Sequence, residues 1–378
     1  MQITNFNTMP NGSFGIDFPD LDSDNTLITV FADSSLLDDD SVLNPLRAAY
    51  PKSKFAGCST SGEIFQSTVN DNTVSVAVAK FEKTNLQCST AEVKNMSDSR
   101  AAGQTLANNL KADDLTSIFI LSDGLNVNGT QLVNGIKANV SEGVIITGGL
   151  AGDGARFERT WILKDRIPTQ NFVSAIGFYG KNINIKSGSR GGWDVFGPER
   201  KVTKSKDNIL FELDDKPALA LYKTYLGELA NELPSSGLLF PLAIRENEDD
   251  QNQIVRTILA IDEKNQSLTF AGDIPEGFLA QLMKANFENL IDGAFSAAEQ
   301  AKLSNSKENT LAIAISCVGR RLVLKERTEE ELESVLDVFS QNTKLVGFYS
   351  YGEIAPHAIT QDCSLHNQTM TLTAITEK

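Results

Sequence analysis

Carboxylates stand beside glycine in three similar phrases of the chain, at residues 57–64, 148–154 and 347–354. The first and third phrases share the pattern Gly-x-x-x-x-Gly-Glu-Ile, and the middle one ends in Gly-Asp-Gly. Such a carboxylate can receive an ammonium group of a ligand, or it can accept backbone N–H bonds and fix its own loop. Its recurrence in every phrase slightly favours the loop-fixing role. The three carboxylates are Glu63, Asp153 and Glu353.

Arginines near the same phrases offer the opposite charge. A guanidinium group matches a carboxylate with two parallel hydrogen bonds, so each is a candidate for binding a ligand carboxylate. An amino acid needs both signs of charge, and the chain offers both beside glycine-rich turns. A surface or structural role is the more frequent one for any single arginine. The four candidates are Arg156, Arg159, Arg320 and Arg321.

The elements around each phrase repeat as well, and they must position the carboxylates. Each phrase is preceded by an apolar run and a helical segment and is followed by an alternating strand, at residues 27–33, 41–50 and 74–78, then 118–124, 130–140 and 172–176, then 311–317, 329–341 and 370–375. The unit is strand, helix, glycine-rich strand end, strand. We therefore predict an α/β protein of two related halves with mixed β-sheets, and a pocket where the glycine-rich strand ends converge.

A change in character near residues 214–217 predicts a domain boundary. Residues 218–233 have the spacing of an amphipathic helix. Residues 275–303 show a longer helical pattern, which we interpret as a lid or interface element and as a docking face for a partner. The predicted division is a lead segment at residues 1–25, an N-terminal domain at 26–215 and a C-terminal domain at 216–378.

Composition excludes several classes of function. The 378 residues are 41% hydrophobic and carry a formal net charge of −15, which indicates a folded protein that nucleic acid and anionic membranes would repel. No segment has the apolar length of a membrane span or the pattern of a signal peptide, so we expect a cytoplasmic protein. The four cysteines form no C-x-x-C pair, which argues against a zinc site and a redox dithiol.

Five ordered motifs resemble those of the FIST domain family, at residues 57–64, 148–157, 316–321, 351–354 and 365–370. The resemblance covers residues 26–373, which includes the N-terminal and the C-terminal parts of that family. It implies a sensory input module of signal transduction that binds small ligands such as amino acids. Some bacterial members are haem proteins that sense nitric oxide and regulate histidine kinases or cyclic-di-GMP enzymes. The resemblance thus implies one of these enzymes as the partner in trans.

We predict a non-catalytic sensory protein that binds a small molecule and passes the signal to a separate enzyme. A ligand that binds two arrangements of the halves differently shifts their populations, and the partner reads the difference. The sequence does not identify the ligand. It also leaves the oligomeric state open, and a homo-oligomer is one of the alternatives. The residues predicted to bind the ligand are Cys58, Ser59, Thr60, Glu63, Gly149, Asp153, Arg156, Arg320, Tyr351 and Glu353.

A haem-binding nitric oxide sensor is the alternative within sensing, with His366 as the axial ligand. Neutral imidazole commonly ligates haem iron, and Cys363 stands nearby in the sequence as a second donor. The C-x-x-C-H sequence for covalent haem attachment is absent. A lone histidine is more often a hydrogen-bonded structural residue, so both interpretations of His366 stay open.

A cysteine-dependent enzyme is the alternative outside sensing. Residues 58–61 are rich in nucleophiles, and Cys317 or Cys363 would form a thiolate–imidazole pair with His366 if the fold brings them within hydrogen-bond reach. The chain lacks the G-x-S-x-G, H-E-x-x-H and P-loop motifs. Serine and threonine beside glycine commonly cap turns, so we expect no catalysis.

Overall fold

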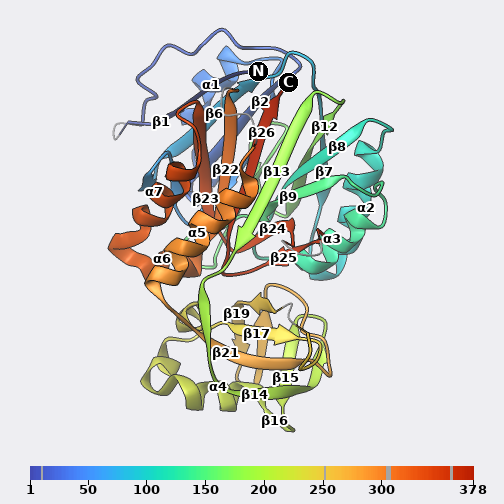
Figure 1. The fold of residues 1–378 in the computed structure, drawn as a ribbon, viewed down its shortest axis with the longest axis vertical. Helices are drawn as coiled ribbons and strands as arrows, with labels where there is room; N and C mark the ends of the chain where they lie inside the picture. Colours follow the sequence, from blue (N-terminus) through green and yellow to red (C-terminus); the bar gives the residue numbers. More distant parts are fainter. Residues whose placement is uncertain (10–11, 251–252, 304–307, 358–360) are drawn as a thin grey trace.

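The computed structural model describes residues 1–9, 12–250, 253–303, 308–357 and 361–378. Two bodies stand one above the other in Figure 1. The upper one, which we call the core body, contains three six-stranded sheets, and the lower one is built on an eight-stranded antiparallel sheet. The lower body consists of residues 193–285, and we call it the inserted domain because the chain leaves the core body and then returns to it.

The three sheets of the core body share one arrangement. A parallel pair lies in the middle, and two antiparallel strands extend each sheet on one side. The apolar runs of the sequence form the central strands, whose near-complete burial explains their continuous hydrophobic character. The strands in sheet order are β1 (Gln2–Asn7), β6 (Val74–Lys80), β2 (Thr26–Ala32) and β3 (Lys54–Ser59); β7 (Asn85–Glu92), β12 (Phe172–Tyr179), β8 (Leu115–Ser122) and β9 (Ile145–Leu150); β13 (Ile183–Arg190), β26 (Met370–Glu377), β22 (Thr310–Cys317) and β23 (Thr343–Ser350).

This arrangement confirms the predicted α/β class with mixed sheets and a repeated unit of strand, helix, strand and strand. Two units and the strand β13 of the third lie in the N-terminal half of the chain, and the remainder of the third lies in the C-terminal half, so the halves are related through the unit. The inserted domain separates β13 from the remainder of the third unit.

A hairpin after each phrase crosses to the sheet of another unit. The first hairpin extends the third sheet beside β23, the second extends the first sheet beside β3, and the third extends the second sheet beside β9. This cyclic exchange ties the three units into one body and brings the ends of the phrases together. The hairpins are β4 (Glu63–Phe65) with β5 (Thr68–Asn70), β10 (Ile162–Lys164) with β11 (Ile167–Thr169), and β24 (Gly352–Pro356) with β25 (Cys363–His366).

The first glycine of each phrase is required by the close approach of a neighbouring strand. A Cβ atom at Gly57, Gly148 or Gly347 would lie 2.4, 1.9 or 1.8 Å from a backbone carbonyl oxygen of the adjacent parallel strand. No side chain fits at such a distance, so glycine is needed at these positions for packing. The repeated glycine therefore serves the fold, whatever the phrases bind.

Helices cover the outer faces of the sheets, and the inner faces pack against one another. Phe31 of the first sheet meets Phe348 of the third at a ring distance of 4.9 Å, and Phe119 of the second joins the same cluster. α2 and α3 cover the second sheet, α5 and α7 the third, and α1 the first. The helices are α1 (Asn44–Ala49), α2 (Ser99–Leu110), α3 (Gly129–Lys137), α5 (Phe287–Ala301) and α7 (Thr328–Val338).

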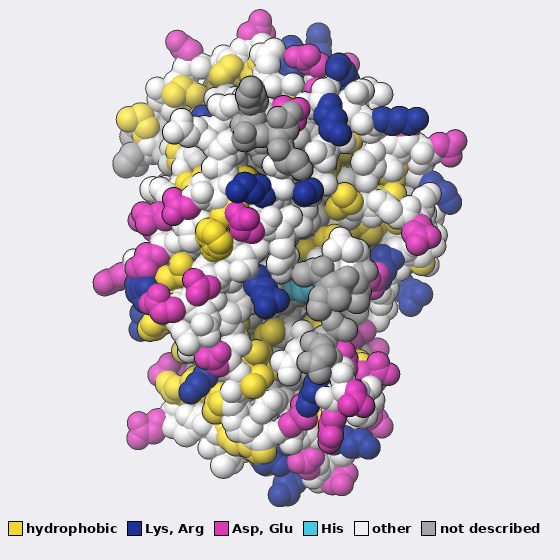
Figure 2. Space-filling view, viewed as in Figure 1, with side chains coloured by type: hydrophobic (Ala, Val, Ile, Leu, Met, Phe, Trp, Pro, Cys, Tyr) yellow, Lys and Arg dark blue, Asp and Glu magenta, His cyan; other side chains and the backbone are white. Residues whose placement is uncertain are grey.

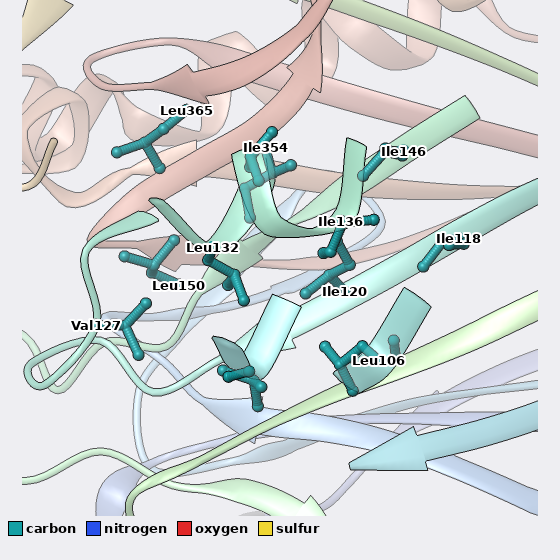
Figure 3. Close-up of a cluster of buried hydrophobic side chains, with 14 of the residues drawn as sticks. Leu106, Ile118, Ile120, Val127, Leu132, Ile136, Ile146, Leu150, Ile354 and Leu365 are labelled. Atoms are coloured by element: carbon teal, nitrogen blue, oxygen red, sulfur yellow. The ribbon is translucent and has the colours of Figure 1, made fainter. Parts of the chain in front are cut away.

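Figure 3 shows the core beneath α2 and α3, where segments far apart in the sequence meet. Leu132 and Ile136 of α3 point toward Ile120 of β8, while Ile354 and Leu365 arrive from the C-terminal hairpin. Each buried side chain of this size contributes about 1.5–3 kcal/mol relative to exposure. The third unit is thereby anchored to the second through its hairpin.

The inserted domain corrects one prediction. Residues 275–303 are not one helical element, because β21 (Leu279–Ala285) pairs with strands on both of its sides before α5 begins. Leu279, Leu282 and Met283 have helix-like spacing, but the neighbouring strands decide their structure. The strands and the helix of this domain are β14 (Trp193–Lys206), β15 (Ile209–Leu213), β16 (Lys216–Pro217), α4 (Ala218–Leu226), β17 (Leu242–Arg245), β18 (Ile254–Arg256), β19 (Ile258–Asp262), β20 (Ser267–Phe270) and β21.

The boundary predicted at residues 215 and 216 lies within this domain, in the turn between β15 and β16. Asp214 and Asp215 have φ angles of 50° and 59° there, as a two-residue hairpin turn requires. The amphipathic helix predicted at residues 218–233 is α4, which ends at Leu226 and continues as 3₁₀ turns. None of the helices in the described ranges combines the length and the apolar character needed to cross a membrane.

Candidate functional site

The three glycine-rich phrases meet at their ends and form a ring of backbone hydrogen bonds. Ser61 donates to the carbonyl of Tyr349 at 2.8 Å, which joins the first phrase to the third. Gly152 donates to the carbonyl of Ser59 at 3.1 Å, which joins the second phrase to the first. Tyr351 closes the ring by donating to the carbonyl of Leu150 at 3.2 Å. The predicted convergence of these strand ends is therefore present.

The ring borders an open depression of about 480 Å³, which we call the strand-end pocket. One wall is the loop that follows β9, and the other is α6 (Val318–Leu324), the helix that follows β22. The pocket thus lies at the carboxyl ends of parallel strands, where α/β folds commonly bind ligands. Its lining residues are Ser61, Gly154, Ala155, Val318, Arg321, Leu322, Lys325 and Glu326.

Arg321 is one of the two cations of this lining, with Lys325. Its Nη1 donates to the Ser61 carbonyl at 2.6 Å, and its two terminal nitrogens reach the Asp71 carboxylate at 2.8 and 2.7 Å. A Cβ atom at Gly62, where φ is 133°, would lie 2.4 Å from Nη1 of Arg321. The glycine therefore makes room for the guanidinium, whose side chain remains 25% exposed.

Arg320, the preceding residue of α6, is buried and points away from the pocket. Its Nε and Nη2 donate to one oxygen of Glu331 at 3.1 and 2.7 Å, Nη2 also reaches the carbonyl of Leu290, and Nη1 reaches that of Gly191. Glu331 in turn accepts from Tyr349 at 2.5 Å. All three nitrogens of Arg320 are thus engaged by the protein, so we do not include it among the proposed ligand-binding residues.

Glu63 and Glu353 hold equivalent positions, and both fix the strand that follows. Glu63 accepts from the hydroxyl of Thr60, and from the backbone and hydroxyl of Thr73 at 3.0 Å each. Glu353 accepts from Ser350 at 2.6 Å, and from the backbone and hydroxyl of Thr369 at 3.2 and 3.0 Å. Burial raises the pKa of Glu63 to about 7 and that of Glu353 to about 8.

Asp153 does not occupy the corresponding position in the middle unit. Ile162 occupies that position. It pairs with the first sheet at the same place in the register at which Glu63 pairs with the third sheet and Glu353 pairs with the second. Asp153 instead accepts from the backbone of residues 157–159 at 2.9 Å each and from the hydroxyl of Tyr351. It therefore fixes the additional loop of the middle unit, and the ring of Tyr351 stacks on Phe157 within that loop, 4.5 Å between centroids.

Asp153→Asn is expected to lower the free energy of unfolding by about 1–3 kcal/mol, because the amide NH₂ would face buried backbone donors. Urea denaturation at neutral pH measures this loss. Asp38→Asn is the matched control, since Asp38 is an exposed carboxylate that binds Arg159 at the surface, and it should leave the free energy of unfolding nearly unchanged. Equal losses in the two variants would contradict the loop-fixing role of Asp153.

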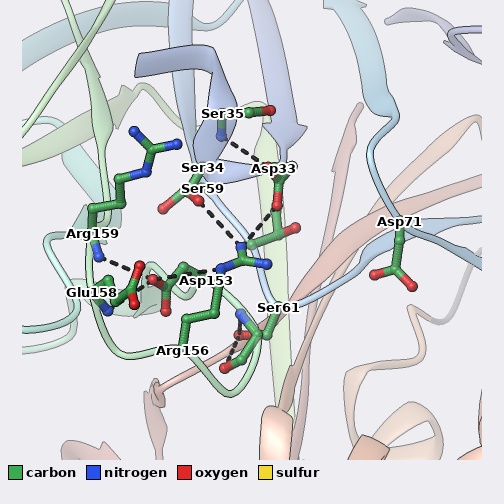
Figure 4. A network of polar contacts seen from close by, with 12 residues as sticks. Asp33, Ser34, Ser35, Ser59, Ser61, Asp71, Asp153, Arg156, Glu158 and Arg159 are labelled. Carbon is green, nitrogen blue, oxygen red and sulfur yellow. Dashed lines mark hydrogen bonds and ion pairs between the residues drawn. The ribbon is translucent and has the colours of Figure 1, made fainter. Parts of the chain in front are cut away.

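The remaining predicted residues surround the ring without lining the pocket. Arg156 is 50% exposed and reaches Asp33 at 3.0 Å and Ser34 at 3.2 Å, as Figure 4 shows. Cys58 lies in the core between the sheets, and Gly149 leaves space for Ile315. The hydroxyl of Ser59 accepts from the backbone of Trp161 at 3.0 Å, and Thr60 binds Glu63.

One ring nitrogen of His366 is engaged by the protein. Its Nε2 lies 3.0 Å from the carbonyl of Ala355, so this nitrogen donates a hydrogen bond and has no lone pair for iron. Burial lowers the pKa of His366 to about 4. Two cavities flank β25, and their linings include Cys363 but not His366. The local geometry matches the structural interpretation of this histidine.

The three buried cysteines lack the surroundings of a nucleophile. Burial raises the pKa of the Cys58, Cys317 and Cys363 thiols. Cys363 and His366 stand three positions apart on β25, and therefore on opposite faces of the strand; the thiol lies 3.4 Å from the carbonyl of Ile146 instead. Within the described ranges, no cluster of histidine, cysteine and acidic residues could hold a metal ion.

Several pocket residues were missed by the sequence prediction. Val318, Leu322 and Lys325 follow one another at helical spacing on α6 and the turn after it, with Arg321 on the same face. This helical spacing was visible in the sequence. The sequence did not show which face of the helix meets the phrases, because that depends on where β22 ends in the folded structure. Ser61 stands inside the first phrase and links it to the middle one, since its hydroxyl accepts from Gly154 at 3.0 Å.

Comparison with known proteins places the chain in a family. The FIST N domain matches residues 26–216 and the FIST C domain matches residues 218–356. An uncharacterized protein of Methanocaldococcus jannaschii is 23% identical over 354 residues, which cover 82% of this chain and 66% of that protein. The chain thus spans about two thirds of the relative it matches.

A crystal structure of a chorismatase aligns with 99% of this chain and 98% of its own chain, at 9% identity and a TM-score of 0.35. A likeness at that score carries no argument about function. The two domain matches together span most of the chain, and FIST domains are sensory domains of signal transduction. The chain belongs to the FIST family.

Proposed function

We propose that this protein is a sensor that binds a small ligand in the strand-end pocket and passes the signal to a separate enzyme. The observation that carries the proposal is the ring of hydrogen bonds through which all three phrases meet beside this pocket. A ligand in contact with Ser61, Gly154 and Arg321 would touch all three units at once. Its binding can therefore report on their relative arrangement.

The charges around the pocket favour a ligand with a carboxylate, such as an amino acid. Arg321 and Lys325 supply positive charge, and Glu326 is available for an ammonium group. The fork of Arg321 already holds a carboxylate, that of Asp71, which is 61% exposed and lies at a surface turn. We propose that a ligand carboxylate takes the place of Asp71, because both would form the same bidentate contact.

Signalling would follow from a shift between two arrangements of the units, since one wall of the pocket comes from the second unit and the other from the third. The two matched domains, at residues 26–216 and 218–356, are both sensory. A histidine kinase or a cyclic-di-GMP enzyme is the partner that we propose, and a cytoplasmic location agrees with either. No observation on His366 or the cysteines favours the haem or enzyme alternatives.

A thermal-shift screen with amino acids and other small carboxylic acids tests the proposal. A ligand near saturation should raise the melting temperature of the wild type by several degrees. Arg321→Met should remove the shift. Arg245→Met is the matched control, because Arg245 also holds a carboxylate, Glu199, with two contacts of 2.7 and 2.8 Å but lies in the inserted domain. A ligand that stabilises Arg321→Met as much as the wild type would refute the assignment of the pocket.

A further inference from the structure

A second cavity, of about 250 Å³, lies at the junction of the core body and the inserted domain. One side is formed by α3 and β25 of the core body, and the other by β17, β18 and the segment before β21. Most of its wall is apolar, and its apolar residues include Val133, Ile244, Ile254, Pro275, Phe278 and Leu365. In Figure 2, hydrophobic and basic side chains appear together at the narrowing between the two bodies.

Arg256 of β18 lines this apolar cavity and is only 4% exposed. Its Nε donates to the carbonyl of Asp273 at 3.0 Å, and its Nη1 donates to the carbonyls of Leu365 and Val255 at 3.1 and 3.3 Å. In the part of the chain that the structure describes, Nη2 has no hydrogen-bond partner and no carboxylate lies within 4.0 Å of the guanidinium. A buried cation is thus held by carbonyl oxygens alone.

Asp273 lines the same cavity and its negative charge acts on Arg256, but its carboxylate forms no ion pair with the guanidinium. Both carboxylate oxygens of Asp273 accept from other side chains, from Asn128 at 2.6 Å and from Gln131 at 2.7 Å. Burial lowers the pKa of Arg256 to about 10, so the group remains charged at neutral pH. A buried charge without a direct ion pair is costly, and an anion that reaches it recovers part of that cost. Lys137 at the rim adds positive charge, although Asp362 binds it.

We propose that this cavity binds a small monocarboxylate with an apolar tail. The carboxylate accepts from Nη2 of Arg256, and the tail lies along Val133, Ile244 and Phe278. The volume suits an unbranched chain of medium length, and the apolar residues beside Arg256 favour a tail without charge. This site is separate from the strand-end pocket. Because its walls belong to both bodies, an occupant fixes the inserted domain against the core body.

Titration calorimetry with octanoate, 1-octanol and acetate at pH 7.5 tests the proposal. The wild type should bind octanoate at least tenfold more tightly than 1-octanol, which has the same tail without the charge, and should not bind acetate measurably. Arg256→Met should weaken octanoate binding at least tenfold and leave 1-octanol binding unchanged. Equal affinity for octanoate and 1-octanol in the wild type would overturn the role of Arg256.

Asn134→Trp provides a second variant that keeps the buried arginine. Asn134 lines the cavity from the partly exposed side of α3, so an indole there fills the space with little effect on the core. It should abolish octanoate binding, whereas Arg159→Met, at the surface of the core body and outside both pockets, should leave it unchanged. Octanoate that binds Asn134→Trp as tightly as the wild type, or that does not bind the wild type at all, would overturn the proposal.

Discussion

Arg320→Met is expected to lower the free energy of unfolding by about 3–5 kcal/mol, the usual cost of removing one partner of a buried ion pair. The reason is that Glu331, with both its own and the Arg320 side chain fully buried, would lose its counter-ion. Tyr349 and Ser316 would still donate to Glu331, but neither carries a charge. Urea denaturation at pH 7 measures the loss.

Arg321→Met is the matched control, since it changes the adjacent residue of the same helix. Its ion pair with Asp71 is partly exposed, and its loss should cost less than about 1 kcal/mol. Arg320→Met combined with Glu331→Leu should recover part of the stability, because replacing a whole buried pair by apolar side chains is often close to neutral. Similar losses for Arg320→Met and Arg321→Met would contradict the assignment of Arg320 to the core and of Arg321 to the pocket.

Stability is also expected to fall between pH 6.5 and pH 8, by about 2 kcal/mol from Glu353 alone. Burial raises the pKa of Glu353 to about 8 and that of Glu63 to about 7, well above the ordinary value of 4.5. The native state therefore holds protons that the unfolded chain has already released, and the stabilisation they provide is lost as the pH rises through the native pKa values. The pH window starts at 6.5 because His366 acts in the opposite direction below that pH. Its imidazole is buried in the neutral form, so protonation there favours the unfolded chain and stability rises with pH.

Urea denaturation at several pH values in this window measures the slope, and Glu353→Gln should flatten it. The amide keeps the shape of the protonated carboxyl, so the variant should equal the wild type near pH 6.5 and exceed it at pH 8. Glu326→Gln is the control, because that carboxylate lines the open strand-end pocket. A wild-type stability that is constant or rises over the window would contradict the protonated state of Glu353.

The repeated unit was predictable because its signals are local. Continuous apolar runs indicated β2, β8 and β22. The glycines at positions 57, 148 and 347 indicated the neighbouring strands, whose backbone approaches β2, β8 and β22 closely. The exchange of hairpins was not predictable. Ile64 pairs with Gly347, which is nearly three hundred residues away, and neither phrase contains a residue pattern that indicates which strand it pairs with. The inserted domain was missed for the same reason, as the pairing of β21 with β14 and β17 overrides its helical spacing.

The candidate site was predicted at the level of the phrases but not of the side chains. Repetition of Glu63 and Glu353 suggested a role in the fold, and the clamps to Thr73 and Thr369 agree with that interpretation. The sequence does not show that Arg320 faces the core and Arg321 the pocket, because adjacent residues on a helix differ only in direction. The loop that Asp153 fixes is longer than its counterparts, which concealed the different position of this carboxylate.

A crystal structure with the best ligand of the thermal-shift screen would test the central claim most directly. We expect electron density for the ligand between Arg321 and Ser61, with its carboxylate on the guanidinium and Asp71 displaced from it. Crystals of Arg321→Met grown with the same ligand should lack that density. A ligand that binds elsewhere while Arg321 and Asp71 remain paired would contradict the proposal that the strand-end pocket is the sensory site.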